Sequence, residues 1–131
     1  RGQNTGPQDE NIRILFVEDE DSVRTFAMRA LKKKGYEVIG CNSAENALEQ
    51  LEKDTAFNLL ITDMVMPGMS GAELAGIVRR KIPAIKIILA SGYSEEIARR
   101  ELASSQDFGF MAKPFSLGDL TKKVFDVLNQ K

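Results

Sequence analysis

Acidic residues follow two short apolar segments of the chain, and this placement is the first sign of chemistry. Ile12–Val17 is a mostly apolar run that leads into four consecutive acids, Glu18–Asp21. A second run, Leu59–Thr62, leads into Asp63. If both runs are strands that end at one edge of a sheet, these acids surround a negative, oxygen-rich space. Carboxylates held together raise a pKa or bind a cation, and hard oxygen ligands favour Mg²⁺.

Two further polar residues occupy similar positions after apolar runs. Ser91 follows Ile85–Ala90, and Lys113 comes shortly after Phe108–Met111. A carboxylate nucleophile, a metal clamp, an ammonium and a hydroxyl donor are the groups that phosphoryl transfer uses. Singly, each has an ordinary explanation as a helix cap, a turn residue or a solvated lysine. Their occurrence together at four predicted strand ends favours a functional site.

Composition limits the class of function. The chain has 131 residues with 43% hydrophobic and 28% charged residues, which suits one globular domain. Its net charge of −1 gives no sign of a nucleic acid or membrane partner, and no apolar run approaches the roughly 20 residues of a membrane span. Histidine is absent, which excludes Ser-His and Cys-His catalysis and His-ligated zinc. The single Cys41 excludes an internal disulfide and fits a reducing compartment.

Alternating strand and helix patterns organise the chain. Residues 1–11 are polar and contain glycine and proline, so we expect a flexible linker or tail there and one domain over residues 12–131. The predicted strands are Ile12–Val17, Glu37–Cys41, Asn58–Thr62, Ile85–Ala90 and Phe108–Met111. Helical periodicity fills the segments between them and after the last. Strands that alternate with helices predict an α/β fold with a doubly wound parallel sheet covered on both faces. Ligands bind such sheets at the carboxyl ends of the strands.

Helix boundaries are marked by capping residues. Serines can cap four of the five predicted helices, at Ser43, Ser70, Ser94 and Ser116. The first helix has an apolar stripe and ends with three lysines before Gly35; the stripe is Val23, Phe26, Ala27, Ala30 and Leu31. The last helix is expected to turn five apolar residues inward: Leu117, Leu120, Val124, Val127 and Leu128.

Four segments resemble the receiver domain of two-component response regulators. They are ILFVEDED (14–21), LLITDMVMPGMSG (59–71), ASGYSEE (90–96) and FMAKPF (110–115). The resemblance covers most of the chain and implies a single (βα)5 flavodoxin-like three-layer sandwich with a parallel five-stranded sheet in the order 2-1-3-4-5. The segments SGYSEE, DFGFMAKPFSLGDL and MVMPGMSG are also similar to the C-terminal receivers of hybrid histidine kinases.

The resemblance implies a role for each site residue. Asp63 would be the phosphorylated aspartate. Asp19 and Asp63 would bind Mg²⁺ directly together with the backbone carbonyl of Val65, and Glu18, one methylene longer than the usual aspartate, would bind it through water. Mn²⁺ would be a substitute metal.

The same comparison assigns the groups that contact the phosphoryl oxygens. Ser91 would donate to one oxygen and Lys113 would pair with another, with a cis peptide between Lys113 and Pro114. Phe110 stands where many receivers have a tyrosine, either as a switch residue or as part of the core. Phe26 and Met28 would dock the helices that carry the histidine, or pack in the core.

The implied partners are a histidine kinase domain, a histidine phosphotransfer protein or both, with no nucleic acid and no membrane contact by this domain. A cytoplasmic location is expected, whether or not the parent protein is anchored in a membrane. The domain would catalyse its own aspartyl phosphorylation and dephosphorylation. Whether the parent is a hybrid histidine kinase or a single-domain regulator is left open by the sequence.

Three other functions share part of this residue pattern. A haloacid-dehalogenase-type phosphatase needs a second aspartate two residues after the nucleophile, where this chain has Val65. A flavodoxin-like FMN binder needs a hydroxyl- and glycine-rich loop after the first strand, and the acids there repel phosphate. A degenerate receiver that acts as a non-phosphorylated docking module remains the alternative.

Overall fold

A parallel five-stranded sheet forms the centre of the computed structural model, which describes residues 12–92 and 108–129. The strand order is β2-β1-β3-β4-β5, as the resemblance implied. The strands are β1 (Arg13–Val17), β2 (Glu37–Cys41), β3 (Leu59–Asp63), β4 (Lys86–Ser91) and β5 (Gly109–Ala112). Each begins one residue or less from its predicted position. The fold is therefore the predicted α/β sandwich.

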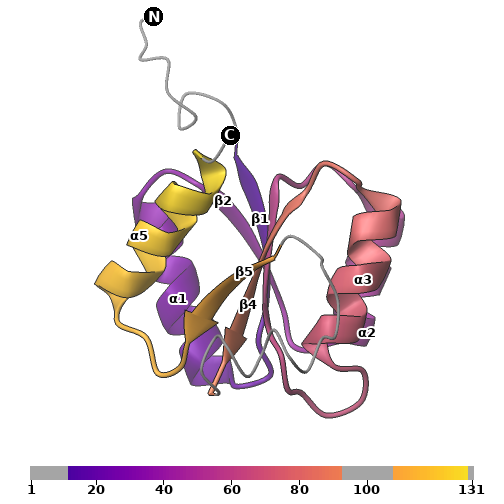
Figure 1. Cartoon of the computed structure of the whole chain (residues 1–131), viewed down its shortest axis with the longest axis horizontal. Coiled ribbons are helices and arrows are strands. Elements are labelled where there is room, and N and C mark those ends of the chain that lie inside the picture. The colour runs from indigo at the N-terminus through magenta and orange to yellow at the C-terminus, as the bar shows by residue number, and fades with distance from the viewer. Residues whose placement is uncertain (1–11, 93–107, 130–131) are drawn as a thin grey trace, which may run out of the picture.

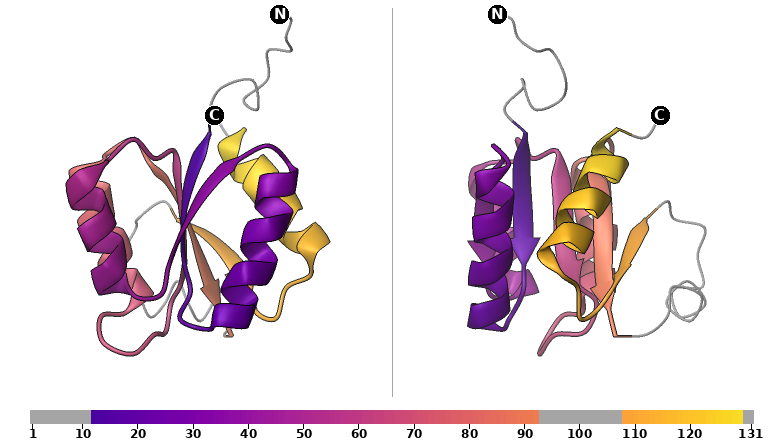
Figure 2. Two further views of the ribbon diagram at one scale, coloured as in Figure 1. Left: turned by 180° about the vertical axis from the view of Figure 1, so that it is seen from behind. Right: turned by 90° about the vertical axis from the view of Figure 1, so that its left-hand side faces the viewer.

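Helices cover both faces of the sheet (Figures 1 and 2). The described helices are α1 (Asp21–Lys33), α2 (Ala44–Lys53), α3 (Gly71–Lys81) and α5 (Leu117–Leu128). α1 and α5 lie against one face, and α2 and α3 lie against the other. The predicted helix that begins after Ser94 lies outside the described residues. None of the helices in the described part of the chain is long and apolar enough to cross a membrane.

The core consists of two hydrophobic layers, one on each side of the sheet. Successive residues of a strand point to opposite faces, so Ile87 packs in the layer under α2 and α3 while Ile88 packs in the layer under α1 and α5. Both side chains are almost fully buried. This double burial explains why the strands are nearly continuous apolar runs.

Three of the four serine caps are present among the described residues. Ser43 caps α2 by accepting from the Asn46 N–H at 3.0 Å. Ser70 and Ser116 begin α3 and α5 with complete capping boxes, in which the third helical residue bonds back to the cap. These caps fix where each helix starts, and so they fix the lengths of the loops at the site.

Two apolar residues lie on the surface: Leu117, which was expected to face inward, and Phe26, for which docking and core packing were both left open. Phe26 is 49% exposed and Leu117 is 38% exposed. α1 buries Ala27 and Leu31, and because each residue turns the helix by about 100°, Phe26 points away from that line of contact. Leu117 occupies the first position of α5, one turn before the buried Leu120. The apolar stripes are thus wider than the faces that the sheet covers.

Candidate functional site

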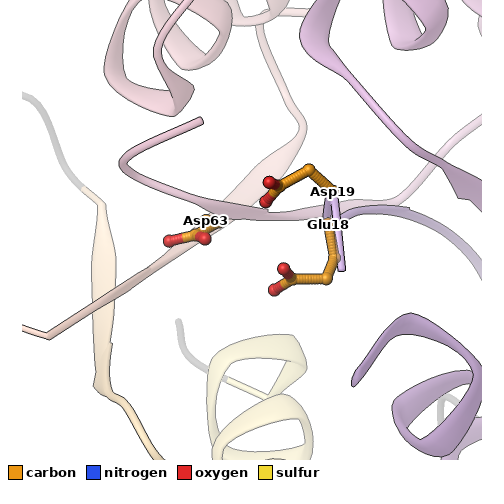
Figure 3. A group of neighbouring side chains, drawn as sticks. All are labelled: Glu18, Asp19 and Asp63. Carbon is orange, nitrogen blue, oxygen red and sulfur yellow. The ribbon is translucent and has the colours of Figure 1, made fainter. Parts of the chain in front are cut away.

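Three carboxylates meet at the carboxyl ends of β1 and β3. Val17 pairs with Thr62 across these neighbouring strands, so the residues that follow them leave the sheet side by side. Glu18, Asp19 and Asp63 each offer an oxygen that lies within 4.8 Å of the others (Figure 3). Glu18 is only 3% exposed, whereas Asp19 is on the surface. The sheet therefore builds the acidic cluster that the sequence predicted.

Lys113 joins two of these carboxylates. Its Nζ donates to Asp63 Oδ2 at 3.0 Å and to Glu18 Oε1 at 3.2 Å. The lysine follows β5, and its backbone N–H donates to the carbonyl of Ser91 at 2.8 Å. Its peptide bond to Pro114 is cis, as the resemblance implied. Residues far apart in sequence thus form one ion-paired group.

Burial and charge shift the pKa values of this group. Burial raises the pKa of Glu18 above its usual value, although the Glu20 N–H and the Lys113 ammonium favour its ionised form; the nearby Asp63 carboxylate adds to the rise. Burial disfavours the Lys113 ammonium, but the hydrogen bonds and charges of Asp63 and Glu18 outweigh it and raise the pKa of Lys113. The carboxylates therefore favour the cationic form of Lys113, whereas burial is the main effect that opposes the ionised form of Glu18.

Ser91 ends the strand beside β3. It is 2% exposed, and the preceding residue, Ala90, pairs with Asp63 and accepts from the Met64 N–H at 2.8 Å. This pairing places the serine at the same edge of the sheet as the acidic cluster. All four predicted strand ends therefore contribute to one rim.

The loop after β3 carries Val65, the expected carbonyl ligand. Val65 is 65% exposed, and its N–H lies 3.5 Å from Asp63 Oδ1. The Gly71 N–H closes the loop by donating to the Met64 carbonyl at 2.9 Å. Phe110, in contrast, is 6% exposed and belongs to the hydrophobic layer under α2 and α3, which fits its interpretation as a core residue in this structure.

Comparison with known proteins identifies the family. Residues 14–125 match the response regulator receiver domain. The chain belongs to this family. A sensor kinase from Brucella abortus, CckA, is 40% identical over 90% of the chain, although the match covers only 13% of that kinase. The Brucella abortus response regulator receiver protein CpdR is 35% identical over 88% of the chain and 96% of its own length.

Solved receiver structures share the fold. The receiver domain of a hybrid histidine kinase CckA is 35% identical, covers 89% of this chain and 99% of its own, and gives a TM-score of 0.75. The response regulator TrrA from Thermotoga maritima, in complex with Mg²⁺ and BeF, is also 35% identical; it covers 88% of this chain and 98% of its own, with a TM-score of 0.77. This chain is thus a receiver domain of two-component systems.

The acidic cluster of this receiver fits a small divalent cation. Mg²⁺ binds oxygen at about 2.0–2.1 Å, so two ligands on opposite sides of the ion lie about 4.2 Å apart. The carboxylate oxygens of Glu18, Asp19 and Asp63 lie within 4.8 Å of one another, close enough to share an ion directly or through water. The donors are all hard oxygens. A bound cation would also offset the cost of burying an ionised Glu18 carboxylate. The geometry and the chemistry of the donors therefore both suit the metal.

One residue at the receiver's rim was missed by the sequence analysis. Arg24, in the first turns of α1, donates from Nη1 to the backbone carbonyl of Glu18 at 2.7 Å. A cation near a helix N-terminus opposes the helix dipole, so an arginine there requires another partner. That conflict and the acid three residues earlier, Asp21, are the local signals, whereas the contact with the Glu18 carbonyl depends on how the chain turns between β1 and α1.

Proposed function

We propose that this receiver takes a phosphoryl group from a phosphohistidine onto Asp63 with Mg²⁺, and then relays the group or switches a partner-binding face. The observation that carries the proposal is the convergence of four strand ends on one rim. There Lys113 Nζ lies 3.0 Å from Asp63, beside the two other carboxylates. A partly buried cation next to a clustered carboxylate is the arrangement that supports a phosphorylated aspartate.

In the proposed reaction, an oxygen of the Asp63 carboxylate attacks the phosphorus in line with the bond to the histidine nitrogen. The P–O bond forms as the P–N bond breaks, and the imidazole leaves with the electron pair. Lys113 stabilises the negative charge on the phosphoryl oxygens, and its raised pKa keeps it protonated. The Ser91 hydroxyl donates to one of the same oxygens. The domain is then the catalyst of its own phosphorylation and dephosphorylation.

The metal has a defined place in this proposal. Asp19, Asp63 and the backbone carbonyl of Val65 would bind Mg²⁺ directly, and Glu18 would bind it through water. When bound, the ion supplies charge neutralisation for the phosphoryl group. Mn²⁺ is expected to substitute. The alternative of a degenerate docking module is less favoured, because the chain keeps Asp19, Asp63, Ser91 and Lys113 and has a carboxylate, Glu18, at the remaining acidic position.

The exposed side of α1 is the proposed docking face for the histidine-carrying helices of a kinase or phosphotransfer protein. Phe26 borders two hollows: one of about 670 Å³ reaches Leu117, and one of about 350 Å³ reaches Lys113. A half-exposed phenylalanine beside the site is the kind of anchor that a partner buries. This face would bring the histidine toward Asp63.

The parent protein is the least defined part of the proposal. We place the receiver domain at residues 12–131, and residues 1–11 as the linker or tail before it, in a cytoplasmic protein or in the cytoplasmic part of a membrane-anchored one. The chain spans 13% of the Brucella abortus kinase CckA and 96% of CpdR. A hybrid kinase and a single-domain regulator are therefore both suitable parents.

Intact-protein mass spectrometry after incubation with acetyl phosphate tests the function. We expect one phosphoryl adduct that requires Mg²⁺ and that Mn²⁺ also supports. The adduct should be absent from Asp63→Asn and retained by Asp126→Asn, which removes an exposed acid on α5. An adduct that survives in Asp63→Asn would disprove the assignment of Asp63. A wild type that stays unmodified by both acetyl phosphate and phosphohistidine donors would favour the docking module.

A further inference from the structure

Arg24 reaches back from α1 to the end of β1. Its Nη1 donates to the Glu18 carbonyl at 2.7 Å, and its Nη2 forms an ion pair with the Asp21 carboxylate. The arginine side chain is only 19% exposed, whereas that of Asp21 is 86% exposed. The contact with the backbone carbonyl is therefore the more sheltered of the two.

The carbonyl that Arg24 contacts belongs to the peptide unit between two residues of the acidic cluster. This unit is planar, so fixing its orientation constrains the directions in which the side chains of Glu18 and Asp19 leave the backbone. On the other side of Glu18, its N–H donates to the Cys41 carbonyl at 3.0 Å. Glu18 is thus held from β2 on one side and from α1 on the other.

The neighbouring strand leaves space for this arginine. A Cβ atom at Gly40 would lie 3.3 Å from Arg24 Cδ and 2.4 Å from Met28 Sδ. The second distance is shorter than any real contact, so the two side chains of α1 occupy the place that a β2 side chain would need. The absence of a side chain at Gly40 allows Arg24 to lie along the sheet toward Glu18.

Electrostatics alone does not favour an arginine here. A fixed positive charge beside the acidic cluster repels a divalent cation that approaches it. The charge also opposes the dipole of α1. If Arg24 acted only through its charge, its removal would strengthen Mg²⁺ binding. If it acts by holding the peptide unit, its removal would weaken binding, so the two roles have opposite signs.

We infer that Arg24 is a positioning residue for the metal site, which orients the Glu18–Asp19 peptide unit so that both carboxylates meet Mg²⁺. The inference rests on the proposed function, because it assumes that these carboxylates bind the metal. Residues that hydrogen-bond to metal ligands without touching the metal typically contribute 10–100-fold to metal affinity. Arg24 is expected to fall at the lower end of that range, since it orients the ligands through one backbone contact.

Isothermal titration calorimetry of the full chain with Mg²⁺ tests the inference. Arg24→Met keeps the apolar stem beside Gly40 and removes the donors, and we expect its Kd to rise roughly tenfold. Arg24→Lys keeps one donor, and its Kd should rise less. The matched control is Asp21→Asn, which removes the exposed ion-pair partner but leaves the Glu18 carbonyl contact, and its Kd should stay within about twofold of the wild type.

Thermal unfolding without metal, followed by circular dichroism, checks that each variant is folded at the titration temperature. If Arg24→Met is folded and binds Mg²⁺ at least as tightly as the wild type, the positioning role of Arg24 is overturned, while the proposed metal site still stands. A wild type that does not bind Mg²⁺ would overturn the metal site itself and this inference with it. If Arg24→Met does not fold, Arg24→Leu, which also removes every donor, takes its place, and an unchanged Kd in that folded variant overturns the role.

Discussion

At the scale of single residues, the site holds buried and partly buried charges that stabilise one another by pairing. Glu18 is almost fully buried, and its burial raises its pKa. Lys113 offsets this by donating to Glu18 and to Asp63. A lysine shared by two carboxylates keeps both in place without metal, and it is then positioned to contact a phosphoryl group on Asp63. Because buried ion pairs contribute little net stability to a fold, the arrangement of these charges is better explained by ligand binding.

Phe26 is the residue at which docking and phosphoryl chemistry can be separated. Phe26→Ser should slow phosphoryl transfer from the histidine kinase or phosphotransfer protein that best phosphorylates the wild type, by roughly tenfold or more, because it removes the exposed aromatic anchor that the partner would bury. Phosphorylation by acetyl phosphate, which needs no docking, should be unchanged. Rates of transfer measured with radiolabelled phosphate check both expectations.

Phe125 provides a matched control for this experiment. It is 53% exposed on α5 and borders neither of the two hollows beside Phe26. Phe125→Ser should therefore transfer at the rate of the wild type. Equal slowing by the two substitutions would argue against a docking face centred on α1.

At the scale of elements, the start of α3 is packed against the end of β3. A Cβ atom at Gly71 would lie 1.9 Å from the backbone oxygen of Asp63, so only glycine allows this approach. The Ser70 capping box begins the helix at the same point. The strand that carries Asp63 and the helix after it are therefore fixed relative to each other by backbone contact, which limits where the intervening loop can place Val65.

A pair of glycine substitutions in α3 tests this packing. Gly71→Ala should lower the free energy of unfolding by about 1–3 kcal/mol, the usual cost of forcing extra volume into a packed region. Gly76→Ala, in the same helix, meets nothing within 4 Å and should raise stability by about 0.5–1 kcal/mol through better helix propensity. Urea unfolding measures both. Equal effects of the two substitutions would contradict the close approach at Gly71.

The sequence predicted these elements well because their signals are local. Strand positions followed from apolar runs, and the starts of α2, α3 and α5 followed from Ser43, Ser70 and Ser116. The exposure of Phe26 was not predictable in the same way. Periodicity shows that a helix has an apolar side, but the width of the buried part depends on what packs against it.

At the scale of the whole molecule, the two edges of the sheet have different roles. The carboxyl edge carries the site, whereas Arg13 joins several segments at the opposite edge. Its guanidinium pairs with Asp54 at 2.7 Å and with Glu37 at 3.3 Å, and it lies 4.5 Å from the centre of the Phe57 ring. This arginine connects β1 to β2 and to the segment before β3, far from the reacting groups.

The Asp54 carboxylate should give the fold a measurable pH dependence. The Ala56 N–H and the Arg13 guanidinium lower the pKa of Asp54 below its usual 3.8. The folded state therefore binds fewer protons than the unfolded state, so this contribution to stability is present above pH 3.8 and is lost as the pH falls through the folded pKa. Urea unfolding should show the wild type more stable than Asp54→Asn at pH 7, with the difference closing in acid.

Asp126→Asn is the control for this measurement. Its ion pair with Lys122 is exposed on both sides, and such pairs contribute little to stability. The difference between wild type and Asp126→Asn should therefore be small at every pH. A difference between wild type and Asp54→Asn that persists unchanged in acid would show that the carboxylate charge is not its source.

The sequence by itself predicted the order of elements and the meeting of the acids that follow β1 and β3. Runs of apolar residues and serine caps are read from neighbours in the chain, and the acids after β1 and β3 must meet because parallel strands bring their carboxyl ends to one edge. Only the tertiary structure decided three features of the site. They are the contacts of Lys113 with Glu18 and Asp63, the hydrogen bond from Arg24 to the Glu18 carbonyl, and the exposure of Phe26. These depend on distances between distant segments and on which faces are covered, and no local pattern records either.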